Sequence, residues 1–209
     1  MVHRREREKP KAAAAAPDRT PAAGQWMRRF VRNLALVVVP AAVVWLLLTP
    51  IYNPFLTAAT ERLLHFTESP DVTRLHYLDH FAQVVRLDYH AEKGYLYRIR
   101  VTDLHFHLIL TFALFLAVPG IAAKRRWENL GWAALISVFF DLLLYFFFVK
   151  FVYATQLGDW SRAHYGTFAQ NFWGLGKHLL DLPFKFALPL ILWAGFYYRD
   201  FTAHLRRAG

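Results

Sequence analysis

Four long runs of apolar residues constrain this chain more than any other feature of its sequence. Each run is about 20 residues long, the length that an α-helix needs to cross the hydrocarbon core of a bilayer. Only 19% of the 209 residues are charged and 56% are hydrophobic, whereas about a quarter of a soluble domain is charged. We therefore predict an all-α integral membrane protein with four transmembrane helices, at residues 34–52, 104–123, 130–154 and 179–198.

The Lys and Arg residues indicate how these helices are oriented. They gather before the first run, where Arg28 and Arg32 lie at its edge, between the second and third runs at 124–126, and after the fourth run. Because positively charged loops stay in the cytoplasm, we predict both termini there, with loops 53–103 and 155–178 outside. The net charge of +10 then has a topological explanation. We expect the lipid bilayer as a partner, and no nucleic acid.

The N-terminal part of the chain divides into a tail and a membrane domain. Residues 1–25 are rich in charge and then in Ala and Pro, which predicts a disordered basic cytoplasmic tail. Residues 26–209 form the four-span membrane domain. Residues 25–33 place Trp26 among arginines and fit a helical turn at the membrane interface. The first run is longer than the apolar core of a secretory signal, so we expect an uncleaved anchor.

The first outer loop begins with a helical pattern. Within residues 54–66, Leu56, Ala59, Leu63 and Phe66 recur at helical spacing. This pattern predicts an amphipathic helix that rests on the outer membrane surface or packs against the bundle.

The same loop continues with a β pattern. Residues 85–90 alternate between apolar and polar side chains, and so do residues 95–102. Residues 91–94 contain Gly and fit the turn between them, which predicts a β-hairpin. A weaker strand is predicted at 74–79. Because a lone hairpin is marginally stable in water, we expect it to dock on the helices or on a partner.

Aromatic and basic side chains in the two outer loops are candidates for partner binding. The strand at 95–102 carries tyrosines and arginines, and loop 155–178 is rich in aromatic residues, which favour membrane interfaces. The candidates are Tyr95, Tyr97, Arg98, Arg100, Trp160 and Trp173.

Ionisable residues within the last two runs predict a polar cluster. Charges at membrane depth are costly, so they normally face the bundle interior and find partners. With a rise of about 1.5 Å per residue, Asp141 and Lys185 lie roughly 17 and 20 Å from the inner edge, close enough to pair. The cluster is either a structural pairing between helices or a binding or former catalytic site. Its members are Asp141, Lys150, His178, Asp181 and Lys185.

We expect neither a metal nor a cofactor. The chain has no cysteine, which excludes thiol nucleophiles, disulfides and cysteine-based metal sites. His105 with His107, and His76 with His80, could each converge as a pair, but spacing places no third or fourth ligand.

The order of these segments resembles the core of the exosortases and archaeosortases. A span, an outer amphipathic segment and an outer hairpin (YLYRIRVTDLHFHLIL) lead directly into a second span, which ends in LAVPGIAAKRRW. Members of that family are membrane transpeptidase-like enzymes that process C-terminal sorting signals. Their catalytic Cys follows the hairpin, and an Arg and a His come later. The resemblance maps these regions onto residues 102–105, onto Lys150, and onto His164 or His178.

The resemblance implies a location and a role. It implies the bacterial inner membrane, so the hairpin would be a small periplasmic insertion. Without a Cys, the acyl-transfer chemistry of the family cannot run as written. Small basic four-span proteins of this kind are similar to the exosortase H-associated membrane proteins. We therefore expect a non-catalytic accessory protein in protein sorting or surface-polymer systems, with an exosortase-like membrane protein as partner. The alternative is an intramembrane enzyme or transfer protein that uses the polar cluster; a small transporter or channel would require oligomerisation.

Overall fold

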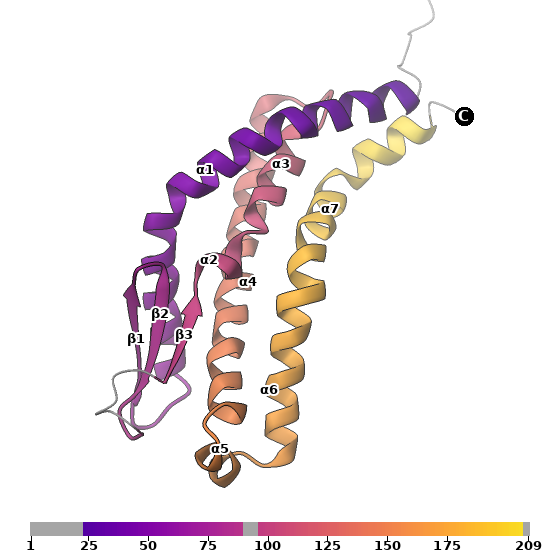
Figure 1. The fold of residues 1–209 in the computed structure, drawn as a ribbon. Helices are drawn as coiled ribbons and strands as arrows, with labels where there is room; N and C mark the ends of the chain where they lie inside the picture. The colour runs from indigo at the N-terminus through magenta and orange to yellow at the C-terminus, as the bar shows by residue number, and fades with distance from the viewer. Residues whose placement is uncertain (1–22, 90–95, 207–209) are drawn as a thin grey trace, which may run out of the picture.

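The computed structural model describes residues 23–89 and 96–206 (Figure 1). Most of the predicted disordered tail, the predicted hairpin turn at 91–94 and the candidate Tyr95 lie outside the described residues. Three helices are long and apolar enough to cross a membrane, at Gly24–His65, Ala123–Thr155 and Thr167–Thr202. The first and last described residues lie at one end of the bundle, the terminal end, and the β-sheet lies at the other, the sheet end.

Helix α1 (Ala23–His65) is one 43-residue helix. The helix predicted at 54–66 is confirmed and packs against the bundle, but it is the last part of α1 because the helix continues through Pro50 and Pro54. Membrane helices tolerate such prolines when neighbouring groups satisfy the freed backbone carbonyls. The predicted apolar stripe is confirmed at its start and fails at its end: Leu56 is fully buried, whereas Phe66 is 89% exposed and Leu64 is buried instead. The sheet and α4 pack against the Leu56–Leu64 face, and that contact selects the buried stripe.

Three short antiparallel strands form a sheet in the order β1 (Thr73–Leu78), β2 (Phe81–Arg86) and β3 (Tyr97–Arg100). Strand β1 confirms the weaker strand that the sequence indicated. The tight turn of the sheet is at Asp79 and His80, both of which have positive φ. Two residues with positive φ are the geometry that lets a two-residue turn follow the twist of the strands.

The predicted first strand of the hairpin was misplaced by about four residues. Strand β2 occupies Phe81–Arg86 instead of 85–90, and Leu87 is 50% exposed. Its buried face is Ala82 and Val84, opposite in parity to the predicted apolar face. A shift of one residue exchanges the two faces of a strand, and packing against the helices decides which face is buried.

The second apolar run is shorter as a helix than predicted. After β3, the chain forms α2 (Thr102–His105) and α3 (Leu108–Ala117). The helix ends before Pro119 and Gly120, and Gly120 has a φ of +79° that breaks helical geometry. The apolar stretch Thr102–Ala117 therefore belongs to the shorter apolar helices.

The C-terminal half forms two long helical segments. Helix α4 (Ala123–Thr155) is followed by α5 (Asp159–His164) and α6 (Thr167–Leu179), and a π-helical turn at Leu180–Phe184 joins α6 to α7 (Lys185–Arg206). The segment 155–178, predicted as an outer loop, therefore contains α5 and most of α6.

A glycine explains how closely α6 approaches α4. A Cβ atom added to Gly176 would lie 2.3 Å from the ring of Phe147, so only glycine fits at this contact. Close packing through small residues is common between membrane helices, because lipid supplies little hydrophobic driving force for association. The aromatic residues of 167–179 thus line a helix surface rather than a loop.

Among the described residues, the buried apolar side chains form two clusters, one at each end of the bundle. At the sheet end, Val84 and Ile99 of the sheet pack against Leu56 of α1 and Leu144 of α4. At the terminal end, Trp26 and Phe30 of α1 pack with α3, α4 and Tyr197 of α7. Residues 25–33, predicted as an interfacial turn, are thus the first part of α1, and two of their aromatic rings are buried.

Candidate functional site

The five predicted cluster residues do not form one bonded group, although the charge of Lys185 acts on Asp141 through space. Asp141 is fully buried in the middle of α4 (Ala123–Thr155), and Lys150 lies nine residues further along it, toward its C-terminal end. His178, Asp181 and Lys185 lie on the α6–α7 helix. The predicted pair is not formed between Asp141 and Lys185, both of which are described: Lys185 instead bonds Asp181, which lies one turn away on its own helix.

Lys177, Asp181 and Lys185 form a ladder of charges along α6–α7. The two ammonium groups lie 2.9 and 2.5 Å from the two oxygens of Asp181. Lys185 also donates to the backbone carbonyl of Asp103, at 3.2 Å. The ladder therefore joins the last helix to the segment that follows β3. His178 stands apart from it, exposed and against the ring of Phe151.

A polar cavity of about 250 Å³, which we call the sheet-end pocket, surrounds Lys150. Its walls come from the connection between α1 and β1, the end of β2, the sheet-end part of α4 and the segment after α5. The pocket is lined by Thr67, Glu68, Ser69, Pro70, Val72, Arg86, Asp88, Lys150 and Tyr165.

Glu68 organises the charges of the sheet-end pocket. Its carboxylate accepts hydrogen bonds from the Thr73 hydroxyl at 2.7 Å and the Thr73 backbone N–H at 3.1 Å. The Lys150 ammonium lies 3.4 Å from Glu68 Oε1, and Arg86 Nη1 lies 4.0 Å from the same oxygen. Both side chains of the Lys150–Glu68 pair are at least nine-tenths buried. Thr73 thus fixes the carboxylate, and the two cations share it.

Arg86 is held between aromatic rings. Its guanidinium carbon lies 4.8 Å from the ring centroid of Tyr153 and 4.7 Å from that of Trp160. Cation–π contacts of this kind orient the planar guanidinium. On the pocket side, Nε lies 2.8 Å from the Asp88 carboxylate. Burial raises the pKa of the nearby Tyr165 hydroxyl, and the positive charge of Arg86 acts in the opposite direction.

A second polar network surrounds His105, deeper in the bundle. The Trp45 indole N–H donates to His105 Nδ1 at 3.0 Å, so that nitrogen carries no proton. Nε2 must then carry the proton and donates to the Asn53 side-chain oxygen at 2.5 Å. The Asn53 amide group donates in turn to the hydroxyls of Tyr77 and Thr102, each at 3.2 Å. Both ring nitrogens of this buried histidine are therefore satisfied.

A third polar group, centred on Asp141, is incompletely bonded. The Tyr52 hydroxyl donates to Asp141 Oδ2 at 2.7 Å. The other carboxylate oxygen lies 3.7 Å from His107 Nδ1, which is too far for a hydrogen bond. Neither ring nitrogen of the buried His107 has a hydrogen-bond partner among the described residues. Since buried polar atoms are normally bonded, this is an unusual arrangement.

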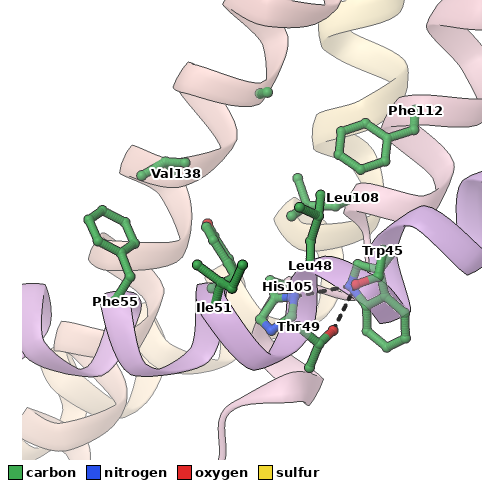
Figure 2. Close-up of a pocket in the computed structure, with 11 residues that line it drawn as sticks. Trp45, Leu48, Thr49, Ile51, Phe55, His105, Leu108, Phe112 and Val138 are labelled. Atoms are coloured by element: carbon green, nitrogen blue, oxygen red, sulfur yellow. Dashed lines mark hydrogen bonds between the residues drawn. The ribbon is translucent and has the colours of Figure 1, made fainter.

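An apolar groove of about 290 Å³ lies beside the second and third networks (Figure 2). Trp45, Leu48 and Ile51 of α1 line it together with Leu108 and Phe112 of α3. His105 and Tyr52 also contribute to its wall, so both deep networks border the same groove.

The candidates for partner binding fall on two surfaces. Tyr97, Arg98 and Arg100 are exposed on β3, and Arg98 lies over the ring of Phe81. Trp160 and Trp173, by contrast, are partly buried against Arg86 and against Phe146 and Phe147, respectively. The structure thus separates a strand surface from two aromatic residues that support the fold.

The candidate histidine pairs do not gain a third ligand in the described part of the chain. No group of three or more His, Cys, Asp or Glu side chains there is placed to hold a metal ion. His105 and His107 belong to different networks, because helical geometry turns residues two positions apart to different sides.

Sequence reasoning missed several partners of the predicted residues. Tyr52 and Asn53 sit at the end of the first apolar run, and polar side chains at that depth were a usable signal. Glu68 and Arg86 gave no such signal, because charged residues in an outer loop are ordinary. Their role depends on the packing of the loop against α4.

Comparisons with known proteins supply no relative: no protein family, curated protein or solved structure matches this chain.

Proposed function

We propose that this chain is a multi-pass protein of the bacterial inner membrane and a non-catalytic accessory of an exosortase-type protein-sorting or surface-polymer system. Three long apolar helices support a membrane location. The first and last described residues lie at the same end of the bundle, and together with the Lys and Arg of the sequence near both termini this favours both termini in the cytoplasm. The shorter apolar stretch Thr102–Ala117 would supply the additional crossing, so that the sheet faces the periplasm.

One observation carries the non-catalytic role. In the segment where the resembled family carries its Cys, the Thr102 hydroxyl, the Asp103 backbone carbonyl and the His105 ring are already bonded within the fold, and the Asp103 carboxylate is exposed. The Thr102 hydroxyl accepts a hydrogen bond from Asn53, and the Asp103 carbonyl accepts one from Lys185. His105 is bonded at both nitrogens. A nucleophile needs a neighbouring base that is available to take its proton, and this segment uses its histidine for structure instead.

The exposed surface of β3 is the part that would contact the partner. It carries Tyr97, Arg98 and Arg100 at the sheet end, away from the first and last described residues. Tyr and Arg are enriched in the residues that dominate binding energy at protein interfaces. An exosortase-like membrane protein, or the tail of its substrate, would bind there.

The test is affinity purification from the native membrane in mild detergent, with mass spectrometry of the captured proteins. The wild-type chain should capture an exosortase-like protein, and the double variant Tyr97→Ala/Arg100→Ala should lose it. Lys124→Ala, at the terminal end and exposed, is the matched control. Equal unfolding temperatures of the three purified proteins would exclude misfolding as the cause. Recovery of the chain alone from wild-type membranes would contradict the proposal.

The apolar groove favours a second candidate, an intramembrane enzyme or transfer protein. Tyr52 contributes to the groove wall and donates to the incompletely bonded Asp141. Alanine substitutions at Asp141, Lys150, His178, Asp181 and Lys185 separate the two candidates. Loss of a lipid- or peptide-transfer activity, with folding and partner capture intact, would favour the second; loss of folding alone would leave these residues structural.

A further inference from the structure

We propose that the sheet-end pocket binds an anionic phosphate group, supplied by the headgroup of an acidic phospholipid or by free phosphate. The site rests on the cavity and on the charges that line it, and only the lipid source of the phosphate rests on the membrane-spanning orientation proposed above.

Lys150 supplies unused donors to the pocket. The residue is only 8% exposed, and its ammonium has three N–H groups. Glu68 accepts one of them at 3.4 Å, a long hydrogen bond. Within the described residues Lys150 forms no other hydrogen bond. A buried ammonium that is poorly bonded beside a polar cavity gains free energy when an anion enters.

Arg86 supplies the second cation, in a fixed orientation. The rings of Tyr153 and Trp160 hold its guanidinium plane. Glu68 is 4.0 Å from Nη1, beyond hydrogen-bond distance, so this nitrogen has donor capacity left for a ligand. Nε and Nη2 lie 2.8 and 3.1 Å from the Asp88 carboxylate, so Nη1 is the nitrogen that would donate to a phosphate oxygen.

The position of the pocket explains why phosphate would be available. Helix α4 is 33 residues long, or about 50 Å, which exceeds the roughly 30 Å hydrocarbon core. Lys150, near the sheet end of α4, thus falls at the level of the headgroups in a membrane-spanning orientation. Trp160 and Tyr165 beside the pocket are residue types that favour this interfacial level.

Asp88 competes with the ligand. Its side chain is 43% exposed and pairs with Arg86 from the pocket wall. Removing its charge should therefore strengthen phosphate binding, whereas removing the charge of Lys150 should weaken it. Two substitutions in one pocket with opposite expected signs distinguish ligand binding from general destabilisation.

The experiment uses the full chain, purified in a neutral detergent. Unfolding temperature is measured during titration with three probes: phosphatidylglycerol, phosphatidylcholine and inorganic phosphate. Phosphatidylglycerol should raise the unfolding temperature of the wild type. Lys150→Met should weaken its apparent Kd about tenfold or more, the effect expected for loss of a hydrogen bond to a charged group. Asp88→Asn should tighten it, and Lys124→Ala should leave it unchanged.

Each outcome decides a part of the proposal. Stabilisation by phosphatidylglycerol but not by inorganic phosphate identifies a lipid headgroup, whereas stabilisation by inorganic phosphate identifies free phosphate. If Lys150→Met does not fold, two other variants still test the pocket. Arg86→Lys should weaken phosphate binding, and Asp88→Asn should tighten it. Equal Kd values for wild type, Arg86→Lys and Asp88→Asn, or no stabilisation by either anionic probe, would overturn the proposal.

Discussion

Two buried histidines, His105 and His107, are only two residues apart and meet opposite environments. His105 faces α1, where Trp45 and Asn53 bond both of its ring nitrogens. His107 faces α4, where the nearest charged group, Asp141, is 3.7 Å away and neither ring nitrogen is bonded. The difference shows that burial alone does not define the role of a polar residue. Hydrogen bonds through His105 and Asn53 join α1 to the sheet, whereas His107 and Asp141 Oδ1 are buried without hydrogen-bond partners among the described residues.

The largest effect should come from Asn53→Ala, which removes the centre of the His105 network. Asn53 bonds His105, Tyr77 and Thr102, so its loss leaves several buried groups without partners. At about 1–3 kcal/mol for each unsatisfied group, we expect a loss of about 3 kcal/mol or more in unfolding free energy. Unfolding of the purified protein in detergent measures it, with the exposed Asn171→Ala as control. Equal stability of the two variants would show that the network contributes nothing.

A smaller loss should follow His105→Phe, which keeps the ring and removes both hydrogen bonds. The indole N–H of Trp45 and the side-chain oxygen of Asn53 would remain without their partner. We expect about 2 kcal/mol of destabilisation, measured in the same unfolding assay. A stability close to that of the wild type would remove the distinction between the two histidines.

Tyr52→Phe should have a more modest effect on the His107 side. It removes the donor to Asp141, whose other oxygen has no hydrogen-bond partner in the described part of the chain. We expect a loss of about 1–2 kcal/mol. The double variant Tyr52→Phe/Asp141→Leu should recover part of this loss, because removing both polar partners costs less than leaving one buried alone. Further destabilisation in the double variant would contradict this explanation.

The smallest effect should come from His107→Phe. The substitution removes two ring nitrogens that form no hydrogen bonds, and the ring still packs edge-to-face on Phe140. We expect a change within about 0.5 kcal/mol of zero, in either direction. The difference in unfolding free energy between His105→Phe and His107→Phe is the most direct test of the contrast between the two histidines. A loss as large as that of His105→Phe would mean that His107 bonds a group that the geometry does not include.

The sequence predicted helices better than it predicted their ends. Apolar runs gave α1, α4 and α7, because the cost of exposed backbone in lipid leaves few alternatives to a helix. The boundaries differ where packing against neighbouring elements decides: α1 continues to His65 without a break, and α6 begins within the predicted outer loop 155–178. Strand β3 was placed correctly, whereas β2 was displaced, because alternation alone does not show which face packs on the helices.

For the candidate site, the sequence identified charged residues but not their partners. The helical rise per residue predicts similar membrane depths for Asp141 and Lys185, yet depth does not determine the direction in which a side chain points from its helix. Asp141 turns toward Tyr52, and Lys185 turns toward Asp181. The sheet-end pocket was not foreseen, because Lys150 had been grouped with α6–α7 instead of with Glu68 and Arg86.

The sequence by itself determined three properties of this chain. It is built from long apolar helices, basic residues flank several of them, and it has no thiol for chemistry. These properties depend on composition and on local periodicity. The tertiary structure alone decided which buried polar groups are satisfied, because hydrogen bonds act over about 3 Å between side chains far apart in the chain. Spacing along one helix could not show that His105 is bonded and His107 is not.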